Sequence, residues 1–382
     1  MRIGIDAREL LGKPTGVGRY LSNLLAEWAI HARTGTWRHD LLLYSPAQEA
    51  SRALERIEGI SSLGAAVRVA AGKPGTWWEQ CQLPAAVRQD HVDVFFAPAY
   101  TSPLGVTQPI VQTIHDVSYM AHPEWFAPRE RFRRSWLTRL SARRARTILT
   151  DSQFSALEIH RHAGVPEHRI RVIPLGVTPW PTDGSRGSDT GRAAAGWPSF
   201  REREPLVLFV GSVLNRRHVP ELIRGFARVA DTVAGARLEI VGENRSYPRQ
   251  DLEAVCRAAG VRDRVSLRAY VSDEELVRLY RSARAFVFLS EYEGFGLTPL
   301  EALACDIPVL LLDTAVARET CGSAAQYVSD ADPGEVAGRL VALLTDEQAH
   351  EAALGAAPAV LARYRWADTA RATMLALEGA AS

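Results

Sequence analysis

Short apolar runs that alternate with helix-like segments are the feature that most restricts how this chain can fold. Neighbouring parallel strands need a long crossover between them, and strands buried on both faces read as continuous apolar runs. The alternation therefore predicts an α/β protein with parallel sheets covered by helices. The expected strands are residues 2–6, 40–45, 66–71, 92–98, 110–116, 147–152 and 169–176, followed by 206–212, 237–243, 265–271, 285–290 and 307–313.

A stretch without periodicity separates the two series of strands. Residues 177–204 are rich in Gly, Pro, Ser and charge, a composition typical of a linker. A chain of 382 residues also exceeds one ordinary core. We therefore predict two Rossmann-like doubly wound domains, 1–178 and 205–364, joined by a linker at 179–204. In such folds a ligand binds beyond the carboxyl ends of the strands, here in the cleft between the domains. A single α/β domain with a long surface insertion is the alternative.

The composition narrows the class of protein. The formal net charge is +1, which argues against binding nucleic acid through bulk charge. The four cysteines, Cys81, Cys256, Cys305 and Cys321, are widely spaced and predict buried thiols in a reducing compartment. The chain starts directly with a strand, without a charged-then-apolar leader, and has no apolar run long enough for a membrane span. We expect a cytoplasmic protein.

The stretch EGFGLTPLE places two acids, Glu293 and Glu301, on either side of a glycine-rich turn into a helix. Thr298 as N-cap and Glu301 three residues later fit a capping box, which leaves Glu293 without a role. Gly294 and Gly296 let the backbone approach an anion closely, and carboxylates accept strong hydrogen bonds from sugar hydroxyls. The stretch therefore indicates a sugar-nucleotide site, with a purely structural turn as the alternative.

This stretch resembles the E-x7-E motif of retaining GT-B glycosyltransferases, in particular glycosyltransferase family 4 and its bacterial mannosyl- and rhamnosyltransferases. The likeness covers nearly the whole chain and implies the GT-B fold, with two Rossmann-like domains. It is carried by five segments in the family's order: PTGVGRY (14–20), TIHDVSYMAHPEWF (113–126), LTDSQFS (149–155), LFVGSVLNRRHVPELIRGF (208–226) and the stretch 269–304 that ends in the motif.

The resemblance implies roles for individual residues. In the family the first motif glutamate touches the donor sugar and the second touches the ribose, which implies these roles for Glu293 and Glu301. It also implies an active-site role near the sugar for His115, although a strand-end histidine by itself is more often structural. Other residues implied to bind the donor are Gly16, Val17, Gly18, Gly211, Ser212, Arg216, Arg217, Glu243, Tyr270, Val271, Gly294, Phe295, Gly296, Leu297 and Thr298.

The charge on a departing nucleoside diphosphate must be stabilised by a metal or by fixed cations and amides. Arg216 and Arg217 match the Arg-Lys pair that family members use, with a departure: Arg217 replaces the lysine, and His218 replaces the asparagine that usually follows. Asp330 and Asp332 form a DxD string, but Asp332-Pro-Gly-Glu is a helix-start signature. We therefore predict a helix cap there, and neither a metal site nor a cofactor.

Gly16 and Gly18 also fit the beginning of a dinucleotide-binding fingerprint. The third glycine is missing and the loop after residue 6 is too long, so a nicotinamide dehydrogenase is a distant alternative. A simple turn is another. We prefer close approach of this backbone to the donor phosphate, as the resemblance implies.

Residues 129–146 carry eight arginines and one glutamate, with Phe132, Trp136, Leu137 and Leu140 at helical spacing. One interpretation is a basic amphipathic face that rests on anionic lipid at the inner face of the membrane and meets a lipid-linked acceptor. The other is a core-packed helix with a solvated outer face. Near the end, residues 365–382 resemble the family's last helix, which crosses back to the first domain.

The resemblance implies metal-independent transfer of a hexosyl group from a nucleoside-diphosphate sugar to a glycan, lipid-linked or small-molecule acceptor. We expect retention through same-face displacement, in which the leaving phosphate helps remove the acceptor's proton. GDP-mannose is the first donor candidate, with UDP-hexoses behind it. The alternatives are another GT-B enzyme, such as an epimerase or phosphorylase, and a catalytically inactive regulatory subunit.

Overall fold

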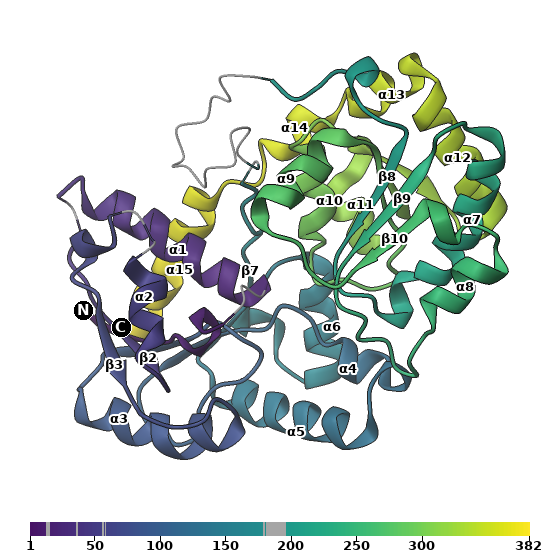
Figure 1. Ribbon diagram of the computed structural model, residues 1–382. Coiled ribbons are helices and arrows are strands. Elements are labelled where there is room, and N and C mark those ends of the chain that lie inside the picture. Colours follow the sequence, from purple (N-terminus) through teal and green to yellow (C-terminus); the bar gives the residue numbers. More distant parts are fainter. Residues whose placement is uncertain (13–15, 36, 56, 58, 179, 181–195) are drawn as a thin grey trace. The chain divides into compact units, whose positions relative to one another are not determined.

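The computed structural model describes residues 1–12, 16–35, 37–55, 57, 59–178, 180 and 196–382 (Figure 1). The described chain forms two compact units. The first contains Met1–Pro123, Pro128–Gly176 and Tyr364–Ser382, and the second contains Glu124–Ala127 and Val177–Arg363. Of the expected linker, residues 179 and 181–195 lie outside the described residues.

The first unit is built on a seven-stranded parallel sheet in the order β3-β2-β1-β4-β5-β6-β7. The inner strands β4, β5 and β6 are buried at every position, which fits their largely apolar sequence, although the ends of β5 and β6 carry buried polar residues such as Gln112 and Thr150. The strands are β1 (Arg2–Asp6), β2 (Asp40–Ser45), β3 (Ala66–Val69), β4 (Val94–Ala97), β5 (Ile110–Thr113), β6 (Thr147–Thr150) and β7 (Ile170–Val172).

Helices cover both faces of this sheet (Figure 1). The helices are α1 (Gly16–Ala32), α2 (Glu49–Glu55), α3 (Leu83–Gln89), α4 (Ser118–Ala121), α5 (Pro128–Arg144), α6 (Gln153–Ala163) and α15 (Trp366–Ala381). On one face α15 packs against α1, where Trp28 Nε1 donates to the carbonyl of Ala370 at 3.0 Å. Thr369 Oγ1 donates to the carbonyl of Pro174 at 2.7 Å. The last helix is therefore part of the first unit.

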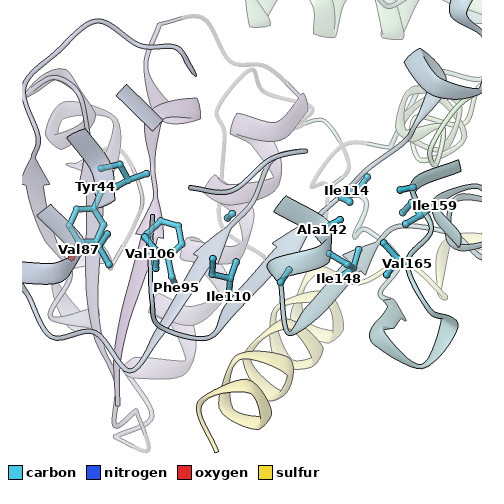
Figure 2. Close-up of a cluster of buried hydrophobic side chains, with 14 of the residues drawn as sticks. Tyr44, Val87, Phe95, Val106, Ile110, Ile114, Ala142, Ile148, Ile159 and Val165 are labelled. Atoms are coloured by element: carbon cyan, nitrogen blue, oxygen red, sulfur yellow. The ribbon is translucent and has the colours of Figure 1, made fainter. Parts of the chain in front are cut away.

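The opposite face of the sheet holds a large apolar cluster, shown in Figure 2. Side chains from the strands meet side chains from α3, α5 and α6 there. Burying such groups stabilises the unit by about 25 cal/mol for each Å² of apolar surface. The labelled members are Tyr44, Val87, Phe95, Val106, Ile110, Ile114, Ala142, Ile148, Ile159 and Val165.

The second unit repeats the design with a six-stranded parallel sheet in the order β10-β9-β8-β11-β12-β13. Its strands are β8 (Leu206–Val210), β9 (Arg237–Val241), β10 (Val265–Arg268), β11 (Ala283–Phe288), β12 (Val309–Leu312) and β13 (Ala325–Val328). Its helices are α7 (Val219–Thr232), α8 (Leu252–Ala258), α9 (Asp273–Ser282), α10 (Leu297–Leu303), α11 (Ala315–Cys321), α12 (Pro333–Thr345), α13 (Glu347–Leu354) and α14 (Ala357–Leu361).

Helix α7 shows how sequence sets the packing in this unit. Its apolar residues recur at intervals of three and four and form a buried stripe that includes Leu222, Phe226 and Val229. Gly225 allows α12 to approach, because a Cβ there would lie 3.1 Å from the carbonyl oxygen of Pro333.

The predicted doubly wound architecture is confirmed in both units. In each sheet the strand order reverses beside the first strand, between β1 and β4 and between β8 and β11. Ligands of doubly wound sheets bind at the carboxyl ends of the strands near such a reversal. Site residues are therefore expected at these two edges. One of the four cysteines differs from expectation, since Cys81 is exposed while the other three are buried.

Candidate functional site

The carboxyl end of β8, at the reversal in the second sheet, is built from closely packed backbone. Gly211 has a φ of +147°, which favours glycine, and a Cβ there would lie 2.9 Å from Nη1 of Arg217. The neighbouring strand β9 ends in Gly242, whose Cβ would collide with the carbonyl of Gly211. There is thus no room for a side chain at Gly211 or Gly242, and the loop that follows β8 packs directly against this end of the sheet.

That loop, a 3₁₀ turn at Asn215–Arg217, directs two arginines toward Glu293. Arg217 donates from Nε to Glu293 Oε1 at 2.7 Å, and its Nη2 lies 2.7 Å from the same oxygen. Its Nη1 donates to the carbonyl of Ser212 at 2.8 Å, and its guanidinium lies 4.7 Å from the ring centroid of Phe288. Arg216 is buried, with Nε 3.9 Å from Glu293 Oε1. Two cations thus lie beside one carboxylate.

Glu293 follows β11, the strand on the other side of the reversal. Ser290 Oγ donates to its Oε1 at 2.8 Å. Burial raises the pKa of the Glu293 carboxyl, but the charges of Arg217 and Arg216 and the two hydrogen bonds outweigh burial, so the pKa is lowered. Glu293 is therefore an ionised acceptor at neutral pH. A backbone hydrogen bond from Glu291 N to the carbonyl of Arg216, 2.9 Å, joins the two loops.

The predicted capping box at Thr298 is wrong. Helix α10 begins at Leu297, one residue before Thr298, and its N-cap is Gly296, with φ +88°. Glycine supplies no side-chain cap, and the positive φ explains why glycine stands there. Glu301 lies inside α10 and is buried. Gly294 and Phe295 are buried in the preceding turn, and Leu297 and Thr298 are half-buried.

Glu243, Tyr270 and Val271 follow β9 and β10, farther from the reversal. Glu243 is exposed and pairs with Arg245 at 2.7 Å. Tyr270 is exposed and Val271 is half-buried. These three residues lie at the same edge of the sheet as Gly211 but belong to separate loops.

In the first unit, His115 follows β5 and is buried. Its Nδ1 lies 2.7 Å from Oδ2 of Asp151, which follows β6, and its Nε2 lies 3.1 Å from the carbonyl oxygen of Pro98, which follows β4. The ring also meets Tyr20 of α1 edge-on, with centroids 5.1 Å apart. Burial lowers the pKa of His115, but Asp151 and the other acceptors outweigh burial, and the pKa is raised.

The predicted glycine loop lies at the start of the same helix as Tyr20. Gly16, Val17 and Gly18 form the first turn of α1, where Gly16 is exposed, Val17 half-buried and Gly18 buried. Residues 13–15, which include the first two residues of the PTGVGRY segment, lie outside the described residues.

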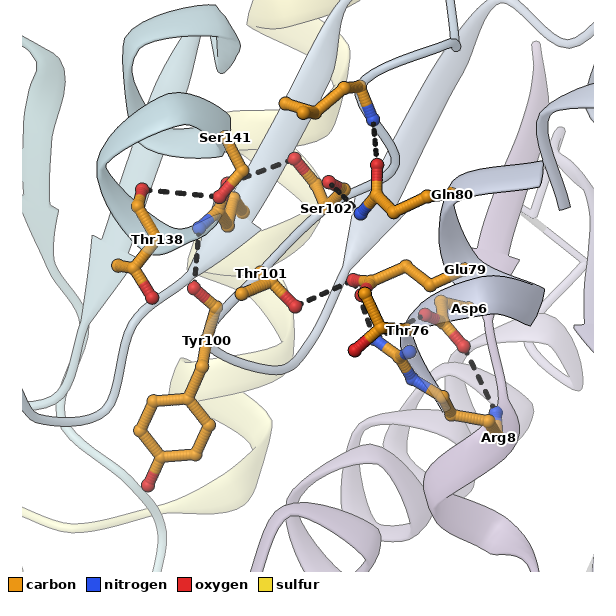
Figure 3. Close-up of polar contacts among 12 residues, drawn as sticks. Asp6, Arg8, Thr76, Glu79, Gln80, Tyr100, Thr101, Ser102, Thr138 and Ser141 are labelled. Carbon is orange, nitrogen blue, oxygen red and sulfur yellow. Dashed lines mark hydrogen bonds and ion pairs between the residues drawn. The ribbon is translucent and has the colours of Figure 1, made fainter. Parts of the chain in front are cut away.

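A second polar cluster occupies the reversal in the first sheet (Figure 3). Arg8 pairs with Asp6 at 3.1 Å and with Glu79 at 2.8 Å, and Thr101 Oγ1 donates to Glu79 Oε1 at 2.6 Å. Burial raises the pKa of Asp6 to about 6, against the opposing effect of Arg8. Both acids are buried, and their contacts join the end of β1 and the loop after β4 to the helical segment Trp78–Gln82, which carries Glu79.

The DxD string acts as the predicted helix cap. Asp332 is the N-cap of α12, and its Oδ1 accepts from the backbone N–H groups of Gly334 and Glu335 at 2.8 and 2.9 Å. Among the residues that the structure describes, no group of three or more His, Cys, Asp or Glu side chains is placed to hold a metal ion.

The structure thus brings Gly211, Ser212, Arg216, Arg217 and Glu293 together in the second unit, while His115 and the α1 glycines belong to the first. Sequence reasoning missed Asp151, Ser290 and Tyr20. The first two each stand just beyond an apolar strand, a position that could have signalled them. Tyr20 is the last residue of the segment PTGVGRY (14–20), and its place in that segment could have signalled it.

Comparison with known proteins gives two family matches. Residues 14–179 match the model of Glycosyltransferase Family 4, and residues 197–357 match that of Glycosyl transferases group 1. Together these ranges cover most of the chain. Solved structures match in fold: Alr3699/HepE of Anabaena, in complex with UDP and glucose, has a TM-score of 0.72 at 18% identity over 99% of this chain and 100% of its own. Sucrose-phosphate synthase of Thermosynechococcus elongatus has a TM-score of 0.73 at 17% identity over the full length of both chains.

Curated relatives match over shorter stretches. An O-antigen chain mannosyltransferase of Escherichia coli is 27% identical over 69% of this chain and 68% of its own. A D-inositol 3-phosphate glycosyltransferase of Xylanimonas cellulosilytica is 31% identical over 60% of this chain and 55% of its own. An uncharacterised glycosyltransferase of Methanocaldococcus jannaschii is 28% identical, and the match spans 58% of its length.

Proposed function

Because the chain belongs to glycosyltransferase family 4, within the group 1 glycosyl transferases of GT-B fold, we propose that it transfers a hexosyl group from a nucleoside-diphosphate sugar. The proposed acceptor is a glycan, a lipid-linked sugar or a small molecule. We assign donor binding to residues 205–364 and acceptor binding to residues 1–178. In this assignment 179–204 is the linker and 365–382 is the helix that returns to the first domain.

The observation that carries the proposal is the cluster of Arg216, Arg217 and Glu293 at the reversal of the second sheet. A diphosphate brings two or more negative charges, and guanidinium groups match its oxygens in pairs. Glu293 lies beside both cations and is ionised, so it can accept a hydrogen bond from a sugar hydroxyl next to the diphosphate. Glu301, from the same motif, is assigned to the ribose hydroxyls.

The proposed reaction retains the configuration of the sugar by displacement on one face. The bond from the anomeric carbon to the leaving phosphate breaks as the bond to the acceptor oxygen forms. The acceptor's proton passes to an oxygen of the departing phosphate. Arg216 and Arg217 stabilise the charge on the nucleoside diphosphate, and Glu293 orients the sugar. No divalent ion is assigned a role, so we expect transfer to proceed in EDTA.

Mannose is the proposed sugar and GDP the proposed nucleotide, because relatives include O-antigen chain mannosyltransferases of Escherichia coli and Salmonella typhimurium. UDP-hexoses come second. A thermal-shift screen against GDP-, UDP- and dTDP-sugars, run with EDTA, is expected to show the largest rise in Tm with GDP-mannose. A larger rise with a UDP-sugar would correct the nucleotide, and no rise with any sugar nucleotide would contradict the donor site.

Removal of one cation should weaken donor binding selectively. The Arg216→Ala variant is expected to bind the preferred donor at least about tenfold more weakly, because a hydrogen bond to a charged group contributes roughly 1.5–3 kcal/mol. Isothermal titration calorimetry measures this change. Arg224→Ala, which removes an arginine that pairs with Glu221 on the exposed side of α7, is the matched control and should bind the donor normally. Equal affinities in all three proteins would contradict the assignment of Arg216.

Two other functions remain to be distinguished by experiment. An epimerase or phosphorylase of the same fold would not release nucleoside diphosphate in proportion to an alcohol acceptor, and an inactive regulatory subunit would release none. Release of diphosphate that depends on an added acceptor supports transfer over both.

Peripheral contact with a membrane through α5 is a further part of the proposal, and the exposure of its aromatic residues favours it. Phe132 and Trp136 are 71% and 52% exposed, whereas Leu137 is buried and Leu140 half-buried, so the expected apolar stripe is divided between the core and the surface. Arg133 donates to Thr76, whose neighbour Trp77 is 74% exposed. Aromatic rings among arginines fit an anionic lipid surface. Among the described residues no helix is long and apolar enough to cross a membrane.

Vesicle flotation tests this contact. The protein is expected to float with vesicles containing phosphatidylglycerol and not with pure phosphatidylcholine, and to detach at high salt. A Phe132→Ser/Trp136→Ser variant should lose most of the binding. Leu375→Ser, which changes a 58% exposed residue of α15, is the control and should bind like the original protein. An original protein that does not float removes the lipid proposal.

A further inference from the structure

Both ring nitrogens of His115 face hydrogen-bond acceptors. Nδ1 lies 2.7 Å from a carboxylate oxygen of Asp151, and Nε2 lies 3.1 Å from the carbonyl oxygen of Pro98. A neutral imidazole carries one N–H, so it can satisfy only one of these contacts. The other nitrogen would then point its lone pair at an oxygen lone pair in a buried setting, where repulsion between like partial charges is strong.

We propose that Asp151 holds His115 as a doubly protonated imidazolium, so that His115 supplies the first unit with a fixed positive charge and does not act as a general base. Asp151 is then a positioning residue that acts through His115. The charge state of the ring follows from contacts within the first unit alone. Its consequence for the reaction rests on the proposed glycosyl transfer.

Counting protons leads to the same charge state. The two hydrogen bonds of the ring require two protons shared among Nδ1, Nε2 and the Asp151 carboxylate. Imidazole is a much stronger base than a carboxylate, with ordinary pKa values of about 6.5 and 3.9. Both protons therefore reside on the ring.

The other groups around the ring also favour the cation. Asp116, the next residue, adds a second negative charge, which raises the pKa of His115. Tyr20 of α1 and Tyr100, in the loop after β4, meet the ring edge-on with centroids 5.1 and 5.7 Å away. Tyr100 donates its hydroxyl to Asp116 Oδ2 at 3.3 Å, and burial holds the Tyr20 phenol in its neutral form by raising its pKa. Burial alone opposes the cation at His115.

The contacts also fix where the charge sits. Pro98, His115 and Asp151 follow three adjacent strands, β4, β5 and β6, so the ring ties their carboxyl ends together. Ser155 of α6 donates its hydroxyl to the carbonyl of His115 at 3.1 Å and holds the backbone from the other side. The cation therefore stands at the edge of the sheet where ligands of doubly wound folds bind. It needs no reorganisation when a negative charge develops nearby.

This charge state determines which group can take the proton of the acceptor hydroxyl. A ring with both nitrogens protonated and engaged has no lone pair with which to accept a proton from an acceptor hydroxyl. In the proposed reaction that proton goes to an oxygen of the departing phosphate, as the same-face displacement requires. His115 then contributes through its charge and through the order that it imposes on three loops.

The charge state is measured directly by NMR of the whole protein labelled with 15N-histidine, with the His115 signal assigned by its loss in His115→Gln. We expect both ring nitrogens of His115 to carry protons at pH 7, above the ordinary histidine pKa of about 6.5, where most of an ordinary histidine has lost one proton. Asp151→Asn should restore ordinary titration. Asp116→Asn removes a neighbouring charge but not the ring contact, and should leave His115 doubly protonated at neutral pH. A neutral His115 at pH 7 in the original protein overturns the proposal whether or not transfer is observed.

The pH dependence of transfer separates a role of the charge from a purely structural role. For the original protein, kcat/KM should show no loss attributable to His115 as the pH rises through the ordinary histidine pKa of about 6.5. For Asp151→Asn it should fall by about tenfold per pH unit once the ring loses its proton. If kcat/KM of Asp151→Asn is lowered by the same factor at every pH, Asp151 only holds the fold together, and the assigned role is overturned. Failed transfer by the original protein, with a doubly protonated His115, would instead reject the proposed function alone.

Discussion

Glu293→Gln is expected to lower the rate of glycosyl transfer by at least about a hundredfold while the protein stays folded. Removal of one positioned group that stabilises a transition state, such as an oxyanion-hole donor, costs about 10²–10³ in rate, and we expect a loss of this order here. Glutamine keeps the size of the side chain but removes the charge that Arg216 and Arg217 share. Both cations would then compete for other acceptors, and the hydrogen bond offered to the sugar would weaken.

The measurement is kcat and KM for release of nucleoside diphosphate, with circular dichroism to check the fold. Glu291→Gln is the matched control, because Glu291 stands two residues earlier in the same loop and its side chain pairs with His218. The control should keep most of the activity. Near-normal transfer by Glu293→Gln would remove Glu293 from the catalytic site.

The stability of the Glu293 variant should also depend less on pH. Because the pKa of Glu293 is lowered in the folded protein, its charge contributes stability that is present above the unfolded-state pKa. That contribution is lost as the pH falls through the folded-state pKa. Acid unfolding followed by circular dichroism should therefore show a shallower loss of stability for Glu293→Gln than for the original protein.

Arg203→Ala is expected to destabilise the second unit by roughly 3–4 kcal/mol. Each buried carbonyl group that loses its donor costs about 1–3 kcal/mol. The total is smaller than the sum over the carbonyl groups, because the surrounding structure partly relaxes. Arg203 is 2% exposed and pairs with no carboxylate among its described contacts. Its guanidinium donates to the carbonyls of Pro198, Tyr280, Ala283 and Cys305 at 2.7–2.9 Å. Burial of the charge lowers the pKa of Arg203 to about 10.

Urea unfolding gives the free energy of unfolding for this variant. Arg201→Ala is the control. Arg201 stands two residues before Arg203 and forms an exposed ion pair with Glu347. Exposed pairs contribute little to stability. Arg203→Lys should be intermediate, because an ammonium has three N–H donors and cannot reach all four carbonyls. If Arg201→Ala and Arg203→Ala unfold at the same urea concentration, the carbonyl contacts do not hold the unit together.

The strands were predictable because each buried strand of a parallel sheet is a short apolar run, but their ends were not. The expected strand at 147–152 ends at Thr150, and the one at 110–116 ends at Thr113. In both cases the extra residues leave the sheet to form contacts at its edge, which propensity does not register. β13 was missed because Ala325–Val328 is an outer strand, mostly half-buried, and so lacks an apolar run.

The sequence suggested residues for the candidate site but could not give their geometry. The motif indicated Glu293 and Glu301, and the turn after β8 indicated the arginines. The sequence could not show that Arg217 and Glu293, 76 residues apart, bond to each other. It also suggested a capping residue at Thr298, where the positive φ of Gly296 starts the helix one residue earlier. Such features depend on tertiary contacts that outweigh local preference.

The position of α15 has a consequence for synthesis on the ribosome. Trp28 bonds to Ala370, 342 residues further along the chain, so the packing of the first unit is completed by residues that are made long after its sheet. Domains usually fold in the order in which they emerge. Here part of one apolar face of the first sheet stays uncovered until α15 leaves the exit tunnel. A chaperone that shields this face during translation would therefore act on the early half of the chain.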